Sequence, residues 1–179
     1  LKWKMDLKKF IRSVPDYPKK GILFRDITTL IKDKNAFKSC IDQMVKISKE
    51  MKIDKVAGIE SRGFVFSSAI SYILNKPNIL LRKENKLPAD KYSVSFDLEY
   101  GKGILEMHKD SISPGEKVLI VDDLIATGGT AEAGAKLIEM SKGEVVGFIF
   151  VINLFDLGGN NLLKKKGYYS KSLIEFPGH

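Results

Sequence analysis

The sequence has few of the residues that build cross-links and thiolate metal sites. Cys40 is the only cysteine among 179 residues, so an internal disulfide is impossible and a zinc cluster of thiolates cannot be assembled. Because Cys40 falls in the apolar stripe of a helical pattern, we expect it to lie in the hydrophobic core. A chain without disulfides is typical of a reducing compartment, so we predict an intracellular, cytoplasmic location.

Long apolar runs are also missing. The longest covers eight residues, 145–152, with one glycine included, whereas a membrane-spanning helix needs about 20. The first ten residues carry charge but lack the apolar segment of a secretory signal. We therefore predict no membrane partner.

Two common nucleotide-binding fingerprints do not occur in the chain. There is no Gly-x-x-x-x-Gly-Lys-Ser/Thr, so a P-loop is not supported. Gly101 and Gly103 have the first spacing of a dinucleotide fingerprint, but Glu106 stands in the third position and no helical pattern follows.

Acidic residues are fewer than basic ones, and the formal net charge is +8. Such a balance suits nucleic acid, a polyanionic small substrate, or lysines that are simply solvated. The alternation of aromatic and basic residues that is typical of single-strand binders is not found. We therefore predict one anionic site on an otherwise solvated basic surface, and no nucleic-acid partner.

The pattern of apolar residues predicts one domain, 1–179, of the α/β class. Hydrophobic content of 44% and charged content of 29% are ordinary for a globular chain of this length. Helices and strands alternate after an N-terminal helix and a turn-rich loop, which favours a mainly parallel sheet flanked by helices. The expected helices are 5–13, 35–52, 63–74 and 131–142, the turn-rich loop is 15–21, and the expected strands are 55–59, 78–81, 117–121 and 144–154.

Three details of this pattern are specific. Asp33 or Asn35 is expected to cap the helix 35–52, and Gly143 to close the helix 131–142. Residues 83–103 are long, polar and without a strong period. A loop of that length in a compact α/β domain often forms a lid.

The stretch 118–130 carries the most chemistry. An apolar strand leads into Asp122 and Asp123, and a loop of small residues then precedes a helix. The backbone amides of that loop and the positive end of the helix dipole suit a phosphate monoester. Carboxylates accept hydrogen bonds only, so they suit the hydroxyls of a sugar beside the phosphate. The stretch therefore predicts a ribose 5-phosphate site, with Ala126, Thr127, Gly128, Gly129 and Thr130 on the phosphate.

Two further segments follow predicted strands. Glu60-Ser-Arg-Gly63 precedes a helix, and Arg82-Lys83-Glu84-Asn85-Lys86 leaves the next strand. Ligands of open α/β sheets bind beyond the carboxyl ends of strands, so both segments should share one rim with the stretch 118–130. Fixed cations there suit a leaving pyrophosphate.

The acidic pair followed by Ala-Thr-Gly-Gly-Thr resembles the phosphoribosyl-pyrophosphate signature of type I phosphoribosyltransferases. Within them, the chain is similar to the adenine phosphoribosyltransferase family over roughly residues 15–140. The segments that carry this likeness are Pro15-Asp-Tyr-Pro18, Gly21-Ile-Leu-Phe-Arg-Asp-Ile27, Ile59-Glu-Ser-Arg-Gly-Phe64, Arg82-Lys83 with Lys86-Leu-Pro88, and Leu98-Glu-Tyr-Gly-Lys102.

The resemblance implies a role for each matching residue. An N-terminal hood, about 1–34, would cover a core of about 35–179, with adenine held between Phe24 of the hood and Leu124. The phosphate loop and the acidic pair would bind the donor as described above. The backbone groups of Leu23 and Arg25 would bind the edge of the purine. Arg62, Lys83 and Lys86 would bind pyrophosphate, and Arg62 would also be catalytic. Glu99 and Tyr100 would belong to a mobile catalytic loop.

The implied activity is transfer of phosphoribosyl from phosphoribosyl pyrophosphate to adenine, which gives AMP and pyrophosphate in purine salvage. Glu99 would handle the proton of the attacking base. Mg²⁺ would be held mainly by substrate oxygens, without a metal site of the protein itself, and the enzyme would be a homodimer. Two alternatives stay open: an enzyme for a 6-oxo purine, and a non-catalytic ligand sensor of the same fold.

Overall fold

The computed structural model describes residues 5–98 and 100–179. Its centre is a seven-stranded sheet in the order β5-β6-β4-β3-β7-β8-β9. Five adjacent strands run parallel: β3 (Lys55–Ile59), β4 (Asn78–Lys83), β7 (Lys117–Ile125), β8 (Glu144–Leu154) and β9 (Ser170–Phe176). The mainly parallel α/β sheet that the sequence predicts is therefore confirmed.

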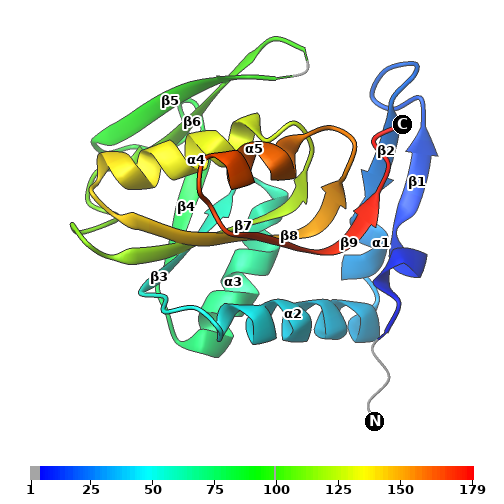
Figure 1. Ribbon diagram of the computed structural model, residues 1–179, viewed down its shortest axis with the longest axis horizontal. Coiled ribbons are helices and arrows are strands. Elements are labelled where there is room, and N and C mark those ends of the chain that lie inside the picture. The colour runs from blue at the N-terminus through cyan, green and yellow to red at the C-terminus, as the bar shows by residue number, and fades with distance from the viewer. Residues whose placement is uncertain (1–4, 99) are drawn as a thin grey trace.

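Helices cover both faces of this sheet, as Figure 1 shows. On one face α2 (Lys34–Ser48) and α3 (Arg62–Leu74) bury one apolar cluster, and on the other α4 (Gly129–Met140) and α5 (Gly159–Lys165) bury a second. The central strands contribute to both clusters because alternate side chains point to opposite faces. Apolar burial on two sides explains why their sequence reads as continuous apolar runs.

Helix α2 shows how local sequence sets an element. The Asp33 carboxylate accepts the backbone N–H groups of Asn35 and Ala36, so Asp33 is the cap. Cys40 is fully buried, as expected. The helix ends at Ser48 rather than at residue 52. No helix in the described part of the chain is long and apolar enough to cross a membrane.

The N-terminal region departs from the prediction of a helix over 5–13. A short 3₁₀ turn, η1 (Leu7–Phe10), is followed by β1 (Arg12–Pro15), which pairs antiparallel with β2 (Leu23–Asp26) in a separate two-stranded sheet. A single turn, α1 (Thr28–Ile31), leads on to α2. The prediction was wrong because pairing with β2, across the loop 16–22, overrides the local helical spacing.

The prediction of an irregular loop over 83–103 was also wrong. Most of it belongs to a hairpin of β5 (Lys91–Asp97) and β6 (Lys102–His108), and β6 pairs antiparallel with β4. Tyr92, Val94 and Phe96 alternate with polar residues and pack toward α4. This period of two is the strand signal that the polar composition concealed.

Three boundaries of the βα units differ from expectation. Strand β7 continues to Ile125 instead of ending at Val121, and α4 begins at Gly129 and ends at Met140. Lys142, with φ 60°, takes the left-handed position after α4 that was assigned to Gly143, while the Gly143 N–H bonds the Ile138 carbonyl. The sequence analysis did not identify α5 or β9.

Candidate active site

A cavity of about 700 Å³ lies beyond the carboxyl ends of β3, β4 and β7. It brings together residues that are up to 91 positions apart along the chain, from Ile59 to Phe150. Of the site residues expected from the sequence, it is lined by Arg62, Lys83, Lys86, Asp122, Asp123, Leu124, Ala126, Thr127, Gly128, Gly129 and Thr130.

The loop from β7 to α4 is shaped by close backbone packing. Gly128, the residue before α4, has φ 92°, which side-chain-bearing residues rarely adopt. The Gly159 N–H donates to the Ala126 carbonyl at 3.0 Å, so the start of α5 braces the loop from outside the cavity. The first amides of α4 have no partners within the helix, and together with the positive end of the helix dipole they suit an anion.

Both carboxylates of the acidic pair line the cavity although they are neighbours in an extended strand. The register of β3 with β7 ends at Gly58 and Val121, so β7 has an open flank from Asp122 onward. Asp123 is 4% exposed and accepts a hydrogen bond from Arg62 Nε at 2.6 Å. The open flank, rather than an early strand end, gives access to both side chains.

Asp122 and Asp123 have different electrostatic surroundings. Burial, together with the neighbouring Asp123 carboxylate, raises the pKa of Asp122 well above its ordinary value. Burial opposes the charge of Arg62, yet the Asp123 carboxylate raises the pKa of Arg62 above its ordinary value. The site therefore keeps one carboxylate paired with a guanidinium, and a second that takes up a proton more readily than an exposed aspartate.

The turn between β3 and α3 packs directly on the acidic pair. A Cβ on Gly63 would lie 2.9 Å from Asp122 Oδ1 and 2.9 Å from the Val121 carbonyl oxygen. Only a residue without a side chain allows this approach. The preceding Glu60–Ser61 peptide bond is cis. The Arg62 turn and the carboxylates thus form one packed unit.

Two glutamates that were not predicted as site residues accept hydrogen bonds from the cationic segment 82–86. Glu60 accepts from Arg82 Nη2 at 3.2 Å and from the Lys83 N–H at 2.6 Å. Glu106, which is 3% exposed, accepts the Asn85 N–H at 2.9 Å and the Ser93 hydroxyl. Glu60 directly follows a predicted strand and so could have been identified. Glu106 could not, because its partners are distant in sequence.

The hood residues lie at the side of the cavity and do not contribute to its lining. The Arg62 guanidinium lies 5.8 Å from the centre of the Phe24 ring, and the Tyr17 ring meets Phe24 edge-on at 5.2 Å. Leu23 is half-buried in the same strand. The Arg25 side chain turns away and donates to Ser13 Oγ and to the Pro177 carbonyl.

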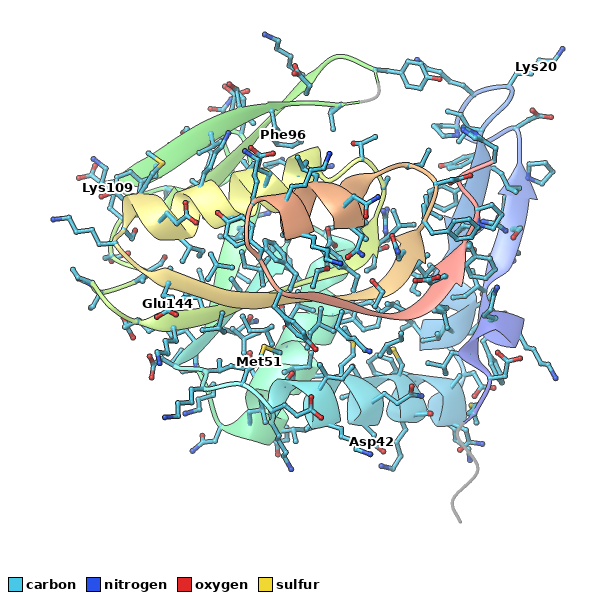
Figure 2. The ribbon with its side chains drawn as sticks, in the orientation of Figure 1. Lys20, Asp42, Met51, Phe96, Lys109 and Glu144 are labelled. Carbon is cyan, nitrogen blue, oxygen red and sulfur yellow. The ribbon has the colours of Figure 1, made fainter. Side chains whose placement is uncertain are left out.

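The β5–β6 hairpin extends over α4 toward the hood (Figure 1). Glu99 lies outside the described residues. The Tyr100 ring lies 4.8 Å from Lys19 Nζ, at the turn between β1 and β2. Phe96 and Leu98 also line the cavity, although the sequence analysis did not identify them. Figure 2 shows Phe96 between the hairpin and α4.

Metal-binding capacity follows from the donors present. Among residues 5–98 and 100–179, no group of three His, Cys, Asp or Glu side chains is placed to hold a metal ion. The cavity does offer the carboxylates of Asp122 and Asp123, the hard oxygen donors that Mg²⁺ prefers. These two carboxylates could contribute ligands to a divalent cation.

Comparison with known proteins agrees with this arrangement. A family model described as "Phosphoribosyl transferase domain" matches residues 27–177. A relative from Pelagibacter ubique named adenine phosphoribosyltransferase is 65% identical over 98% of this chain and 100% of its own length.

Solved structures give the same result. The adenine phosphoribosyltransferase of Thermoanaerobacter pseudethanolicus superposes with a TM-score of 0.91 at 45% identity, over 96% of this chain and 98% of that one. The Saccharomyces cerevisiae enzyme, solved with adenine and an imino-altritol bisphosphate, gives 0.87 at 33% identity, over 94% and 97%. By this likeness over nearly its whole length, the chain belongs to the adenine phosphoribosyltransferase family.

Proposed function

We propose that this protein transfers the phosphoribosyl group of phosphoribosyl pyrophosphate to adenine, giving AMP and pyrophosphate. The bond from adenine N9 to the anomeric carbon forms, the bond from that carbon to pyrophosphate breaks, and the N9 proton is released. The observation that carries the proposal is the joining of an anion loop, two carboxylates and a cationic rim in one cavity. Family membership supports the same reaction.

The donor is assigned to the core of the sheet. Residues 126–130 take the 5′-phosphate at the start of α4, and Asp122 and Asp123 accept hydrogen bonds from the ribose hydroxyls. Arg62 lies beside the carboxylates, and Lys83 and Lys86 lie on the same cavity wall. These cations stabilise negative charge as it develops on pyrophosphate in a displacement with oxocarbenium character.

Mg²⁺ is the cofactor in this proposal. Its ligands would come mainly from substrate oxygens, with Asp122 and Asp123 as the cavity carboxylates able to contribute, and it would supply positive charge to stabilise the leaving group. The experiment is to titrate a chelator during turnover, and activity that survives complete removal of Mg²⁺ would contradict this part of the proposal.

The base is assigned to the space between Phe24 and Leu124. An aromatic ring face suits the stacking of a purine, and the backbone groups of Leu23 and Arg25 read its edge. The related yeast enzyme was solved with adenine, which supports the choice of adenine over a 6-oxo purine. A site that hydrogen-bonds the exocyclic amine rejects a carbonyl in its place.

Glu99 is assigned to the proton on the attacking base, with Tyr100 beside it in the same loop. A well-placed general acid or base contributes about 100-fold to 10,000-fold. Glu99→Gln is therefore expected to lower kcat by at least about 100-fold while donor binding persists. Normal turnover in this variant would remove Glu99 from the mechanism.

A homodimer is the proposed assembly. The outer face of α3 exposes Val65, Tyr72 and Ile73 at helical spacing, and Leu80 of β4 is exposed on the same side of the sheet. Contiguous exposed apolar side chains of this kind mark interaction surfaces. Sedimentation of the wild type and of Tyr72→Glu tests this surface, and a monomeric wild type would contradict it.

Two further assignments complete the proposal. Residues 1–34 form the hood and residues 35–179 the core of one domain, and the enzyme works in the cytoplasm. The buried single cysteine accords with a reducing compartment.

The deciding experiment follows AMP formation from adenine, phosphoribosyl pyrophosphate and Mg²⁺, with hypoxanthine and guanine in parallel. AMP from adenine with no product from the other bases is the expected result. Product from hypoxanthine or guanine instead would assign a 6-oxo purine. No product from any base, in a folded sample that binds the donor, would favour a sensor.

A further inference from the structure

The Arg25 side chain connects the hood to the last strand of the sheet. Its guanidinium lies 4.5 Å from the centre of the Phe176 ring and donates through Nη2 to the Pro177 carbonyl at 3.1 Å. Nη1 donates to Ser13 Oγ at 2.6 Å within the hood itself. Both Arg25 and Phe176 are half-buried, so the cation lies on the ring with only part of its surface in water.

The partner segment of Arg25 is itself tied to the core. The Phe155 N–H donates to the Phe176 carbonyl at 3.1 Å, and the Gly178 N–H donates to Asp156 Oδ1 at 2.6 Å. Phe176 also lies opposite Leu154 in the register of β8 and β9. Residues 176–178 are therefore fixed to the end of the main sheet, and Figure 1 shows β9 beside β2.

Strand geometry makes this contact relevant to the base. Adjacent residues of a strand point to opposite sides, and in β2 the Phe24 ring approaches Arg62 of the cavity while Arg25 approaches Phe176. The strand is thus held from both sides. Movement of Arg25 off the ring would let β2, and Phe24 with it, move relative to the cavity.

We propose that Phe176 is a positioning residue for adenine, acting through Arg25 to hold the Phe24 ring at its place beside the cavity. The inference rests on the proposed function. Phe176 contacts Arg25 rather than the Phe24 ring that faces Arg62 of the cavity, so its action on the base would be indirect. Its effect should fall on the base and spare the donor, since the donor residues belong to the core strands and the turns that follow them.

The experiment compares Phe176→Ala with Lys8→Ala. Lys8 Nζ lies over the same ring at the same 4.5 Å but belongs to η1 rather than to the strand that carries Phe24. Phe176→Ala is expected to raise the KM for adenine about fivefold to tenfold, with the KM for phosphoribosyl pyrophosphate changed by less than about twofold. Lys8→Ala should leave both constants unchanged.

A conservative variant and a double mutant separate positioning from loss of stability. Phe176→Tyr keeps the ring face and should restore the wild-type KM for adenine. Arg25→Ala should match Phe176→Ala, and the double variant should be no worse than either single one. Equal increases in both KM values, or a Phe176→Ala enzyme with unchanged adenine KM, would overturn the inference.

A binding measurement keeps this test separate from the test of the proposed function. Calorimetric titration with AMP reports on the site without turnover, and AMP affinity should fall in Phe176→Ala and recover in Phe176→Tyr. A wild type that binds AMP but forms none from adenine would refute the proposed function alone. A wild type that turns over adenine, with AMP affinity equal in all variants, would refute the role of Phe176 alone.

Discussion

The two halves of the proposed site are built in different ways. The donor half comes from the ends of β3, β4 and β7 and from the turns that follow them, and its groups are held by buried contacts such as Arg62 to Asp123 at 2.6 Å. The half proposed to bind the base sets Leu124 of β7 against Phe24 of the two-stranded sheet β1–β2, which is separate from the main sheet. The small sheet meets the rest of the molecule through contacts such as Arg25 on Phe176.

This difference matches the chemistry of the two substrates. A highly charged donor needs groups that are fixed before it arrives, because preorganised charges and amides stabilise it at no cost of rearrangement. A flat neutral base needs two apolar faces, which a separate hairpin can supply after the donor has bound. Changes in the donor half should therefore be severe, and changes in the base half moderate and confined to adenine.

Among the residues that divide the site into these two halves, the largest effect is expected from Asp123→Asn. Loss of the buried carboxylate leaves the Arg62 guanidinium without its partner and removes an acceptor for ribose. We expect kcat/KM for phosphoribosyl pyrophosphate to fall on the order of 100-fold, with little change in adenine affinity. The control is Asp42→Asn, which breaks an exposed pair with Lys38 of 2.8 Å and should be neutral. A larger effect on adenine than on the donor would relocate the ribose site.

A second prediction tests the brace behind the phosphate loop. A Cβ on Gly159 would lie 2.5 Å from the Ala126 carbonyl oxygen, so Gly159→Ala should displace the loop and lower kcat/KM for the donor about 30-fold. Gly134→Ala is the matched control, because there the nearest atom lies at 3.4 Å, an ordinary contact in the middle of α4. It should stabilise the protein by up to about 1 kcal/mol. Steady-state kinetics and thermal unfolding measure both, and normal donor kinetics in Gly159→Ala would show that the loop does not need the brace.

The third prediction addresses the base half. Phe24→Ala removes the ring proposed to stack on adenine and should raise the KM for adenine about tenfold, a typical loss for one aromatic–base stack. The KM for phosphoribosyl pyrophosphate should stay within about twofold. Phe24→Trp keeps a ring face and serves as the control. If Phe24→Ala impaired the donor as strongly as adenine, the division of the site into two halves would fail.

The smallest effect on activity is expected from Asp26→Asn, at the foot of the hood. Hydrogen bonds from the Thr28 side chain and from Arg12 lower the pKa of Asp26 to about 2, from an ordinary 3.8. Because the folded-state pKa is the lower one, this carboxylate stabilises the fold fully above pH 3.8 and loses that contribution as the pH falls toward 2. Asp26→Asn should lower the free energy of unfolding at pH 7 by about 1 to 3 kcal/mol.

Urea unfolding at pH 7 and pH 3 measures this contribution. The wild type should lose more stability than Asp26→Asn between the two values, since only the wild type has the carboxylate to protonate. The KM for adenine should rise a few-fold at most. Parallel pH profiles of the two proteins would contradict the assignment of this acid effect to Asp26.

The sequence predicted the donor half better than the base half. The stretch 118–130 is a local pattern in which strand, acidic pair and loop follow one another, so the residues of the phosphate loop line the cavity as expected. The parallel arrangement then places Arg62 and Lys83 on the same wall, because strand ends meet at one edge. Even the error in the length of β7 left both carboxylates in the cavity.

The base half depends on contacts that no local pattern reveals. The strand β1 forms only by pairing with β2, and the Arg25 side chain is directed by Phe176, which lies 151 positions away. The polar composition of residues 83–103 likewise hid a hairpin whose partner strand, β4, precedes it. Pairing between strands thus decided the elements that local propensity placed wrongly.

Because Gly63 packs closely on Asp122 and Val121, the proposed donor, phosphoribosyl pyrophosphate, would be bound at two points whose spacing is set by the protein. The turn proposed to bind pyrophosphate and the carboxylates proposed to bind ribose cannot move closer together, because the space between them at Gly63 does not admit even one Cβ. Two anchors at a fixed spacing give the second one a high effective concentration once the first has bound. When the bond between the two parts of the donor breaks, that advantage disappears, so the reaction itself weakens the hold on both products.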